Sequence, residues 1–319
     1  MMRASLWAIV VSALAIPAVL RAAPFTLIVC GSGGDAQYEV RFQDWGERLR
    51  AVLIGLGHPQ DHVGLLTETG ENADGRSEAG TILHRLEGLK TRVGPDDDLF
   101  IYLIGHGSYR RAARLGLPGP DLRADDISHS LTGFKSKSIT IINTASTSGP
   151  FIRALGAEGR IVITSTKSAD ENNATRFAEY LIQGLESGGA DGNRDDRISV
   201  LEACRQAAAL TAAGYTAEGL LATEHAVIDG NGDGRPTRLD ALDLTPEGGL
   251  PNRVFLKDWA FPDGVPRAWI ETYRAAINRV EDLISRRGEL AEEAYWEELE
   301  ARLLNAAEAH RRIRKIQGD

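Results

Sequence analysis

The sequence predicts an α/β fold with a mainly parallel sheet, and three observations support this. Short apolar runs alternate with stretches whose apolar residues recur at helical spacing. Two of the runs, at 99–104 and 139–142, are continuous, which is typical of central strands covered on both faces. Both of these runs end abruptly in small polar residues. Ligands bind at the carboxyl ends of parallel strands, so we expect a site there.

The composition is that of a globular protein with a core. The chain has 319 residues, of which 43% are hydrophobic and 25% charged, so one large domain or two smaller ones are expected. The formal net charge of −9 argues against nucleic acid as a partner. The two cysteines, Cys30 and Cys204, do not make a disulfide framework. One bridge between them is an option, but we favour two separate buried thiols.

The N-terminus has the pattern of a secretory signal peptide over residues 1–22. A basic start at 1–3 precedes an uncharged apolar stretch at 5–20, and the alanines at 22–23 offer a cleavage region. An uncleaved membrane anchor is the alternative, although the stretch is short for a spanning helix. We therefore expect an exported protein, periplasmic or extracellular, with membrane contact only if this segment stays uncleaved.

An α/β domain is expected over residues 24–260. The glycine-rich loop after its first strand does not match the GxGxxG motif, which argues against a dinucleotide site. In chain order we expect a strand at 25–29, a helix at 40–56, a strand at 62–66, a helix at 77–93 capped by Ser77, a strand at 99–104, a helix at 121–131, strands at 138–142 and 159–165, and a helix at 173–185.

The C-terminal part, residues 266–317, is expected to be helical and heavily charged. Apolar residues at three- and four-residue spacing predict a helical hairpin or one long helix. A dimerising coiled coil is the alternative, which the short and irregular repeat disfavours. The sequence does not define the oligomeric state.

The two strand ends carry the residues that point to chemistry. The first apolar run, in DLFIYLIGHGS, delivers His106 and Gly107, and the second, in INTASTSG, delivers Ser146. These stretches resemble the histidine strand and the nucleophile strand of the caspase, gingipain and legumain clan of cysteine peptidases. The likeness is greatest to the legumain-like branch, whose pattern is Ala-Cys-x-Ser-Gly. The resemblance covers about residues 25–185 and implies a caspase-like sheet.

The resemblance implies a base at His106, a nucleophile at position 146, and oxyanion donors at the backbone N–H groups of Gly107 and Ser146. The clan uses cysteine as nucleophile, and this chain has serine. A serine hydroxyl ionises far less readily than a thiol and needs a base that a third group orients. Asp35 or Glu171 are the carboxylates that could approach.

We therefore predict an exported peptidase-fold protein with weak activity or none, which binds peptides or proteins. The alternative is an active serine endopeptidase that uses His106 and Ser146. A plain structural role also stays open for Ser146, as a cap of a helix near Gly149.

Two acidic loops, at 191–202 and 229–240, have the ligand spacing of EF-hand calcium loops. In the first, Asp196 stands where glycine is usual and strains the turn; in the second, Gly234 fits but Pro236 interrupts. Solvated turns without metal are the alternative. We expect His225 to be structural rather than a ligand. The predicted calcium ligands are Asp191, Asn193, Asp195, Arg197 through its carbonyl, Ser199 and Glu202 in the first loop, and Asp229, Asn231, Asp233 and Asp240 in the second.

Overall fold

The computed structural model describes residues 23–241, 247–259, 261 and 264–316. They fall into two compact units, which meet in the sequence between Asp258 and Trp259. The predicted signal peptide, residues 1–22, lies outside the described residues. Among the helices that are described, none is long and apolar enough to cross a membrane.

The described part of the first unit is built on a 7-stranded sheet with the order β11-β10-β8-β7-β3-β1-β2. The neighbours from β2 to β8 pair in parallel, whereas β10 runs antiparallel to both β8 and β11. The predicted α/β class with a mainly parallel sheet is confirmed. The strands are β1 (Phe25–Cys30), β2 (Val63–Leu66), β3 (Asp98–Ile104), β7 (Ser138–Asn143), β8 (Arg160–Thr164), β10 (Val227–Asp229) and β11 (Thr237–Arg238).

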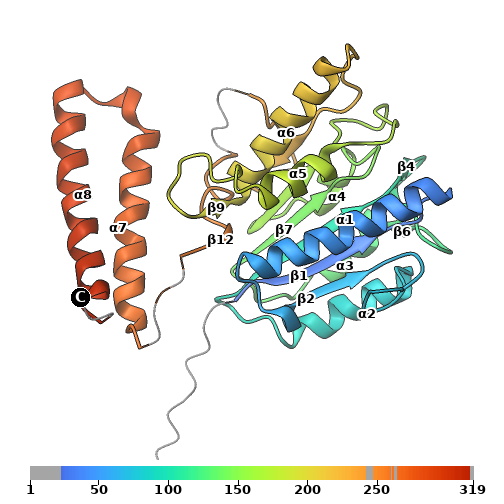
Figure 1. Cartoon of the computed structure of the whole chain (residues 1–319), viewed down its shortest axis with the longest axis horizontal. Helices are drawn as coiled ribbons and strands as arrows, with labels where there is room; N and C mark the ends of the chain where they lie inside the picture. Colours follow the sequence, from blue (N-terminus) through green and yellow to red (C-terminus); the bar gives the residue numbers. More distant parts are fainter. Residues whose placement is uncertain (1–22, 242–246, 260, 262–263, 317–319) are drawn as a thin grey trace, which may run out of the picture. The chain divides into compact units, whose positions relative to one another are not determined.

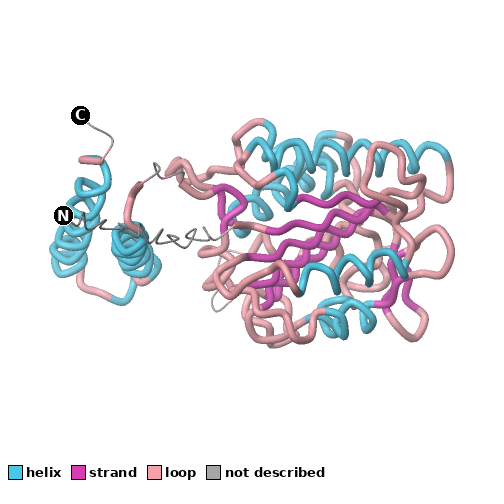
Figure 2. The backbone as a smooth tube through the Cα atoms, turned by 90° about the horizontal axis from the view of Figure 1, so that it is seen from below, coloured by secondary structure: helices cyan, strands magenta, loops and turns pink. Residues whose placement is uncertain are grey.

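Helices cover both faces of the sheet (Figures 1 and 2). One apolar cluster joins the sheet to α1 (Ala36–Gly55), α5 (Phe177–Glu186) and α6 (Val200–Ala217). A second cluster joins the other face to α2 (Ala79–Lys90), α3 (Ala124–Ser130) and α4 (Phe151–Leu155). Successive strand residues alternate between the clusters, as Ile101 and Tyr102 do. Both faces of the sheet are therefore buried, which explains the continuous apolar runs.

Short elements complete the first unit. A three-stranded sheet consists of β4 (Gly107–Tyr109), β5 (Ala113–Leu115) and β6 (Leu122–Arg123), and β9 (Ile198–Ser199) pairs with β12 (Phe255–Lys257). A 3-10 turn, Gln60–His62, precedes β2. Because β4 begins at the residue after His106, this small sheet lies next to the predicted site.

The second unit is a helical hairpin of α7 (Arg267–Ser285) and α8 (Glu292–Arg314), joined by a 3-10 turn at Arg287–Glu289 (Figure 1). This corresponds to the hairpin among the predicted arrangements. Of the apolar residues at three- and four-residue spacing, Val280 and Tyr295 are buried, but Ile284 and Leu303 are exposed. These apolar residues therefore do not all lie on one buried face.

Three helices begin at other residues than predicted, and a side-chain cap explains the first of these differences. Helix α1 begins at Ala36, since Asp35 accepts N–H bonds in its first turn. The prediction that Ser77 caps α2 was wrong: Glu78 is at the N-cap, and the buried Ser77 hydroxyl has no hydrogen-bond partner within the described residues. Helix α5 begins at Phe177 rather than at 173.

The two cysteines, Cys30 and Cys204, are free and buried, so the prediction of separate thiols is confirmed. Cys30 ends β1 and lies against α1, where a methyl group on Gly46 would meet its sulfur. Burial raises the pKa of both thiols far above their usual range. Neither cysteine therefore supplies a reactive thiolate.

Candidate active site

Polar residues follow the carboxyl ends of the five parallel strands. Neighbouring parallel strands end at the same edge of a sheet, so these residues gather there. They are Ser32 after β1, Glu68 after β2, His106 after β3, Ser146 after β7 and Thr166 after β8. Backbone and side-chain hydrogen bonds join their loops. The structure thus brings the predicted residues His106, Gly107 and Ser146 to one edge.

The ring of His106 is held on the side of β1 and α1. It makes T-shaped contacts with Tyr38 and Phe42, with ring centroids 4.7 and 5.1 Å apart. Partial burial lowers the pKa of His106, and a ring N–H bond to the Gly33 carbonyl and the nearby Asp35 carboxylate offset part of this effect. The imidazole is therefore neutral at neutral pH, the form that a general base requires.

The group that orients the His106 ring is a backbone carbonyl. Asp35 is one of the two predicted carboxylates. Its side chain caps the start of α1, where it accepts the N–H groups of Gln37 and Tyr38 at 2.9 and 3.0 Å. The Gly33 carbonyl bonds the ring itself. A carbonyl fixes the tautomer of the ring but carries no full negative charge to stabilise an imidazolium.

Glu68 holds the loop that presents this carbonyl, and the sequence analysis missed it. Its carboxylate accepts the Ser32 hydroxyl at 2.5 Å and the Gly33 N–H at 2.8 Å. These two bonds tie the loop after β1 to the loop after β2, so they fix Gly33 against His106. The available signal was a charged residue just after an apolar strand, the same signal that singled out His106.

Ser146 lies in a turn after β7, where its hydroxyl is covered. The residue is 2% exposed, and its Oγ accepts the N–H of Gly107 at 3.2 Å. The hydroxyl oxygen of Ser146 therefore already accepts one of the two N–H groups that were expected to hold an oxyanion. The other, the N–H of Ser146, has no acceptor among the described residues. The next residue, Thr147, has φ 55°, which is rare for a β-branched residue; such strain concentrates at functional sites.

Buried hydroxyl groups fix the Ser146 turn to the loop after β8. The Oγ of Ser148 lies 3.3 Å from that of Ser165 and 3.0 Å from Oγ1 of Thr166. The Ser165 hydroxyl also donates to the carbonyl of Ala145 at 2.9 Å. The three hydroxyl side chains are fully buried. None of these bonds uses the side chain of residue 146.

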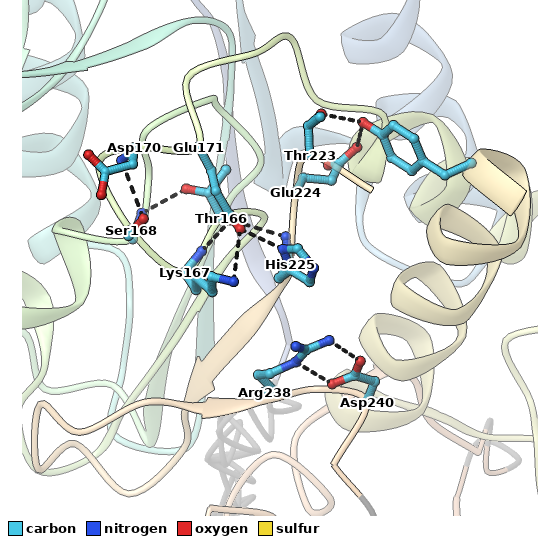
Figure 3. A network of polar contacts seen from close by, with 12 residues as sticks. Thr166, Lys167, Ser168, Asp170, Glu171, Thr223, Glu224, His225, Arg238 and Asp240 are labelled. Carbon is cyan, nitrogen blue, oxygen red and sulfur yellow. Dashed lines mark hydrogen bonds and ion pairs between the residues drawn. The ribbon is translucent and has the colours of Figure 1, made fainter. Parts of the chain in front are cut away.

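Glu171 belongs to a separate network beside this turn (Figure 3). Its backbone carbonyl accepts the N–H of Thr147 at 2.9 Å. Its carboxylate accepts Nδ1–H of His225 at 2.5 Å and lies 3.5 Å from Nζ of Lys167. Among the described contacts of Glu171 none involves His106, so this second predicted carboxylate does not orient the base.

The arrangement places a histidine of lowered pKa and a covered serine hydroxyl at one edge of the sheet. In the described part of the chain no hydrogen bond joins the side chains of His106 and Ser146. Catalytic hydrogen bonds often tighten only when substrate binds. Gly107, at the start of β4, packs so closely on the backbone of Ser146 that a methyl group there would meet the Ser146 carbonyl oxygen. The geometry is therefore compatible with a silent site and with a slow serine-based one.

In the first acidic loop, side chains turn inward onto backbone N–H groups. Asp191 accepts the N–H groups of Asp195 and Asp196 at 3.1 and 3.0 Å, and Asn193 accepts that of Asp195 at 2.9 Å. Asp196 has φ 66° at the position where glycine is usual, so the expected strain is present.

Three predicted ligands of this loop also have protein partners. The Asp195 carboxylate forms an ion pair with Arg197 at 2.9 Å. The Ser199 hydroxyl donates to Glu202 at 2.8 Å, and Ser199 accepts the N–H of Glu202 at 3.1 Å. This capping box begins α6. An ion in the loop would compete with these partners.

The second acidic loop follows β10 and folds in the same way. Asp229 is fully buried and accepts the N–H groups of Gly232 and Gly234 at 2.8 and 2.9 Å. Asn231 accepts the N–H of Asp233 at 2.9 Å. Gly234, at the usual glycine position, has φ 76°.

The far end of the second loop holds a carboxylate that the sequence analysis missed. Asp240 pairs with Arg238, whereas Glu247 is 3% exposed, and its burial together with Asp229 and Asp233 raises its pKa. Within the described residues, no group of three or more His, Cys, Asp or Glu side chains is arranged to hold a metal ion. Calcium binding at either loop stays a prediction.

One segment of the chain matches a known family. The neighbouring parallel strands β3 and β7 end beside His106 and Ser146, as the resemblance to caspase-like peptidases implies. Residues 83–204 match the model of the Peptidase C13 family, the legumain family of that clan. The matched segment runs from α2 into α6 and contains His106 and Ser146. The predicted resemblance is confirmed.

Among solved structures, the chain is similar to the crystal structure of protein GSU0716 from Geobacter sulfurreducens. The two share 11% sequence identity with a TM-score of 0.38, over 52% of this chain and 83% of that chain. A search of the curated proteins found no match.

Proposed function

We propose that the protein is an exported, legumain-like peptidase-fold protein that binds peptides or proteins and has weak proteolytic activity or none. The family match supports peptide or protein as the bound class. The observation that carries the proposal is the state of Ser146. Its oxygen is buried and accepts the Gly107 N–H, one of the two groups expected to hold an oxyanion.

The alternative is an active serine endopeptidase, and one observation favours it. The pKa of His106 is lowered by burial, so the ring is free to accept a proton at neutral pH. Substrate binding would then have to break the Gly107–Ser146 bond and bring Oγ to the ring. The weak point of this alternative is that a carbonyl, not a carboxylate, orients the base.

Replacing Ser146 separates the two proposals. We expect the parent protein and Ser146→Ala to show equally low cleavage of a peptide library. Ser146→Cys is expected to cleave at least about tenfold faster, because a thiol is partly ionised and intrinsically nucleophilic near neutral pH. Cleavage rates for the three proteins, measured by mass spectrometry of the peptide products, provide the comparison.

Two controls make the result specific. Ser187→Cys places a thiol at the exposed end of α5, outside the strand-end loops, and should leave cleavage unchanged. His106→Ala in the Ser146→Cys background should remove any gain. Parent activity that Ser146→Ala abolishes would instead establish the serine endopeptidase. Failure of all variants to cleave any peptide would leave a binding module without peptidase chemistry.

We also propose that the loop Asp191–Glu202 binds calcium, and more weakly the loop Asp229–Asp240. The inward-turned oxygens of Asp191, Asn193 and Asp195 support this, since calcium takes oxygen ligands at alternate loop positions. Calcium at about one hundred times its Kd should stabilise the fold by about 2.7 kcal/mol, seen as a rise in Tm.

Asp191→Asn should remove most of that calcium-dependent rise in Tm. Asp125→Asn, which changes an exposed carboxylate of α3, is the matched control and should keep it. A Tm that calcium does not move in the parent protein would show that both loops are metal-free turns.

Export remains a proposal that rests on residues 1–22 alone. The mass of the mature protein, recovered from cells, tests it. A chain that retains Met1 would favour an uncleaved anchor or an internal protein.

A further inference from the structure

The outer face of α8 carries an apolar stripe that its own hairpin leaves uncovered. Trp296, Leu303 and Leu304 are 50%, 48% and 63% exposed. With Leu299, Glu300 and Ala307 they line a shallow depression of about 500 Å³. The side chains of α8 that are buried are others: Tyr295, Ala306, Ala309 and Ile313. Exposed apolar surface of this kind is typical of an interaction site.

Charges of opposite sign flank the stripe on the same helical face. With about 3.6 residues per turn, Glu292 and Glu293 precede the stripe on this face, and Arg311 and Arg314 follow it. In the described part of the chain, none of the four side chains forms an ion pair. The face therefore has an acidic end, an apolar middle and a basic end.

A second copy of α8 complements this pattern only if it runs antiparallel. A two-fold axis near residue 302 places the acidic end of each helix beside Arg311 and Arg314 of the other. It also places the large Trp296 beside the small Ala307, and Leu299 beside Leu304. A parallel pair would bring like charges together, which is unfavourable.

We propose that the protein forms a homodimer through this face, with the two α8 helices antiparallel. The two-fold symmetry makes one surface serve both partners, which is the usual form of a dimer interface. The charge pattern identifies a second copy of this chain as the occupant. The proposal does not depend on the peptidase chemistry of the first unit.

Sedimentation of the full-length chain over a wide concentration range tests the dimer. Leu303→Asp should raise the dimer dissociation constant about a hundredfold or more, because it places a carboxylate in the apolar middle of both copies. Arg311→Glu and Glu293→Arg should each raise it about tenfold, and the double variant should restore dimerisation. Arg312→Glu is the matched control: Arg312 points off this face and pairs with Glu308 of its own helix.

Engineered cysteines test the direction of the helices. Leu303→Cys lies near the axis and should form a disulfide between copies, whereas two Trp296→Cys positions should lie roughly 17 Å apart along the helices and should not. The native thiols are buried and should not interfere. Circular dichroism confirms that each variant keeps its helices. A monomer at all concentrations, a dimer that Leu303→Asp leaves intact, or equal crosslinking at both positions would overturn the proposal.

Discussion

Gly107→Ala should destabilise the protein by about 1–3 kcal/mol, because the site has no room for a methyl group. A Cβ on Gly107 would lie 2.1 Å from the carbonyl oxygen of Ser146 and 3.4 Å from that of Arg114. Both neighbours are backbone atoms, so the start of β4 must move away from the Ser146 turn. Chemical denaturation of the variant measures the loss in free energy of unfolding.

Gly88→Ala is the matched control for this substitution. Gly88 lies within α2, and a methyl group there would meet nothing within 4 Å. Alanine is favoured over glycine in a helix by about 1 kcal/mol, so this variant should be neutral or more stable. If both alanine variants behave alike, β4 does not pack on the Ser146 turn as described. Gly107→Ala in the Ser146→Cys background should also lose cleavage, since the oxyanion donor moves with β4.

Glu224→Gln should change how stability depends on pH. Glu224 lies between α6 and β10 and is 5% exposed, and burial raises its pKa to about 7 from 4.5. The hydroxyl of Tyr215 and the N–H groups of Arg176 and Phe177 donate to it and offset part of that effect. The folded state therefore holds this proton more tightly than the unfolded state does.

This difference in proton affinity determines whether the stability rises or falls with pH. The stabilisation from protonated Glu224 is fully present below about pH 4.5 and is lost as the pH rises to about 7. The change amounts to about 3 kcal/mol. Glutamine does not titrate, so the variant should gain stability relative to the parent as the pH rises through this window. Unfolding free energies of both proteins at a series of pH values give the comparison.

His58 should change the stability with pH in the direction opposite to Glu224, which provides an internal check. It is 3% exposed, accepts the Thr26 hydroxyl and donates to the Leu256 carbonyl, and burial lowers its pKa to about 4. Its contribution is present above about pH 6.5 and is lost as the pH falls towards 4. In the parent protein the two slopes oppose each other. Glu224→Gln should therefore expose the acid sensitivity due to His58; equal pH profiles for parent and variant would contradict the assigned burial of Glu224.

The central strands could be predicted because burial on both faces leaves a clear mark in the sequence. Strands β1, β3, β7 and β8 are apolar runs, and each was expected within a residue or two of its bounds. Strands β4 to β6 have two or three residues each, several of them exposed, so they leave no periodic pattern. Helix α1 was placed too far along the chain, because the exposed Val40 was used as its first residue and the cap at Asp35 was overlooked.

For the candidate site, the sequence points to residues at single strand ends but not to contacts between distant segments. His106 and Ser146 were expected from their own strands and from the family pattern, and their roles stay predictions. Glu68 reaches Gly33 across 35 residues, and Glu247 reaches Gly230 across 17. Glu68 does follow an apolar strand, but the N–H groups that these two carboxylates accept occur in every residue, so the sequence does not show where the carboxylates bind. The bond between Gly107 and Ser146 is hidden for the same reason.

The buried hydroxyl groups of Ser148, Ser165 and Thr166 bear on which side chains position 146 can carry. Their hydrogen bonds fix the turn after β7, and none of them involves the side chain of Ser146. We therefore expect cysteine or alanine at position 146 to leave this turn in place, although alanine removes the acceptor of the Gly107 N–H. The chemical group that the turn presents can then change by a single substitution, without rearrangement of the sheet edge that carries it.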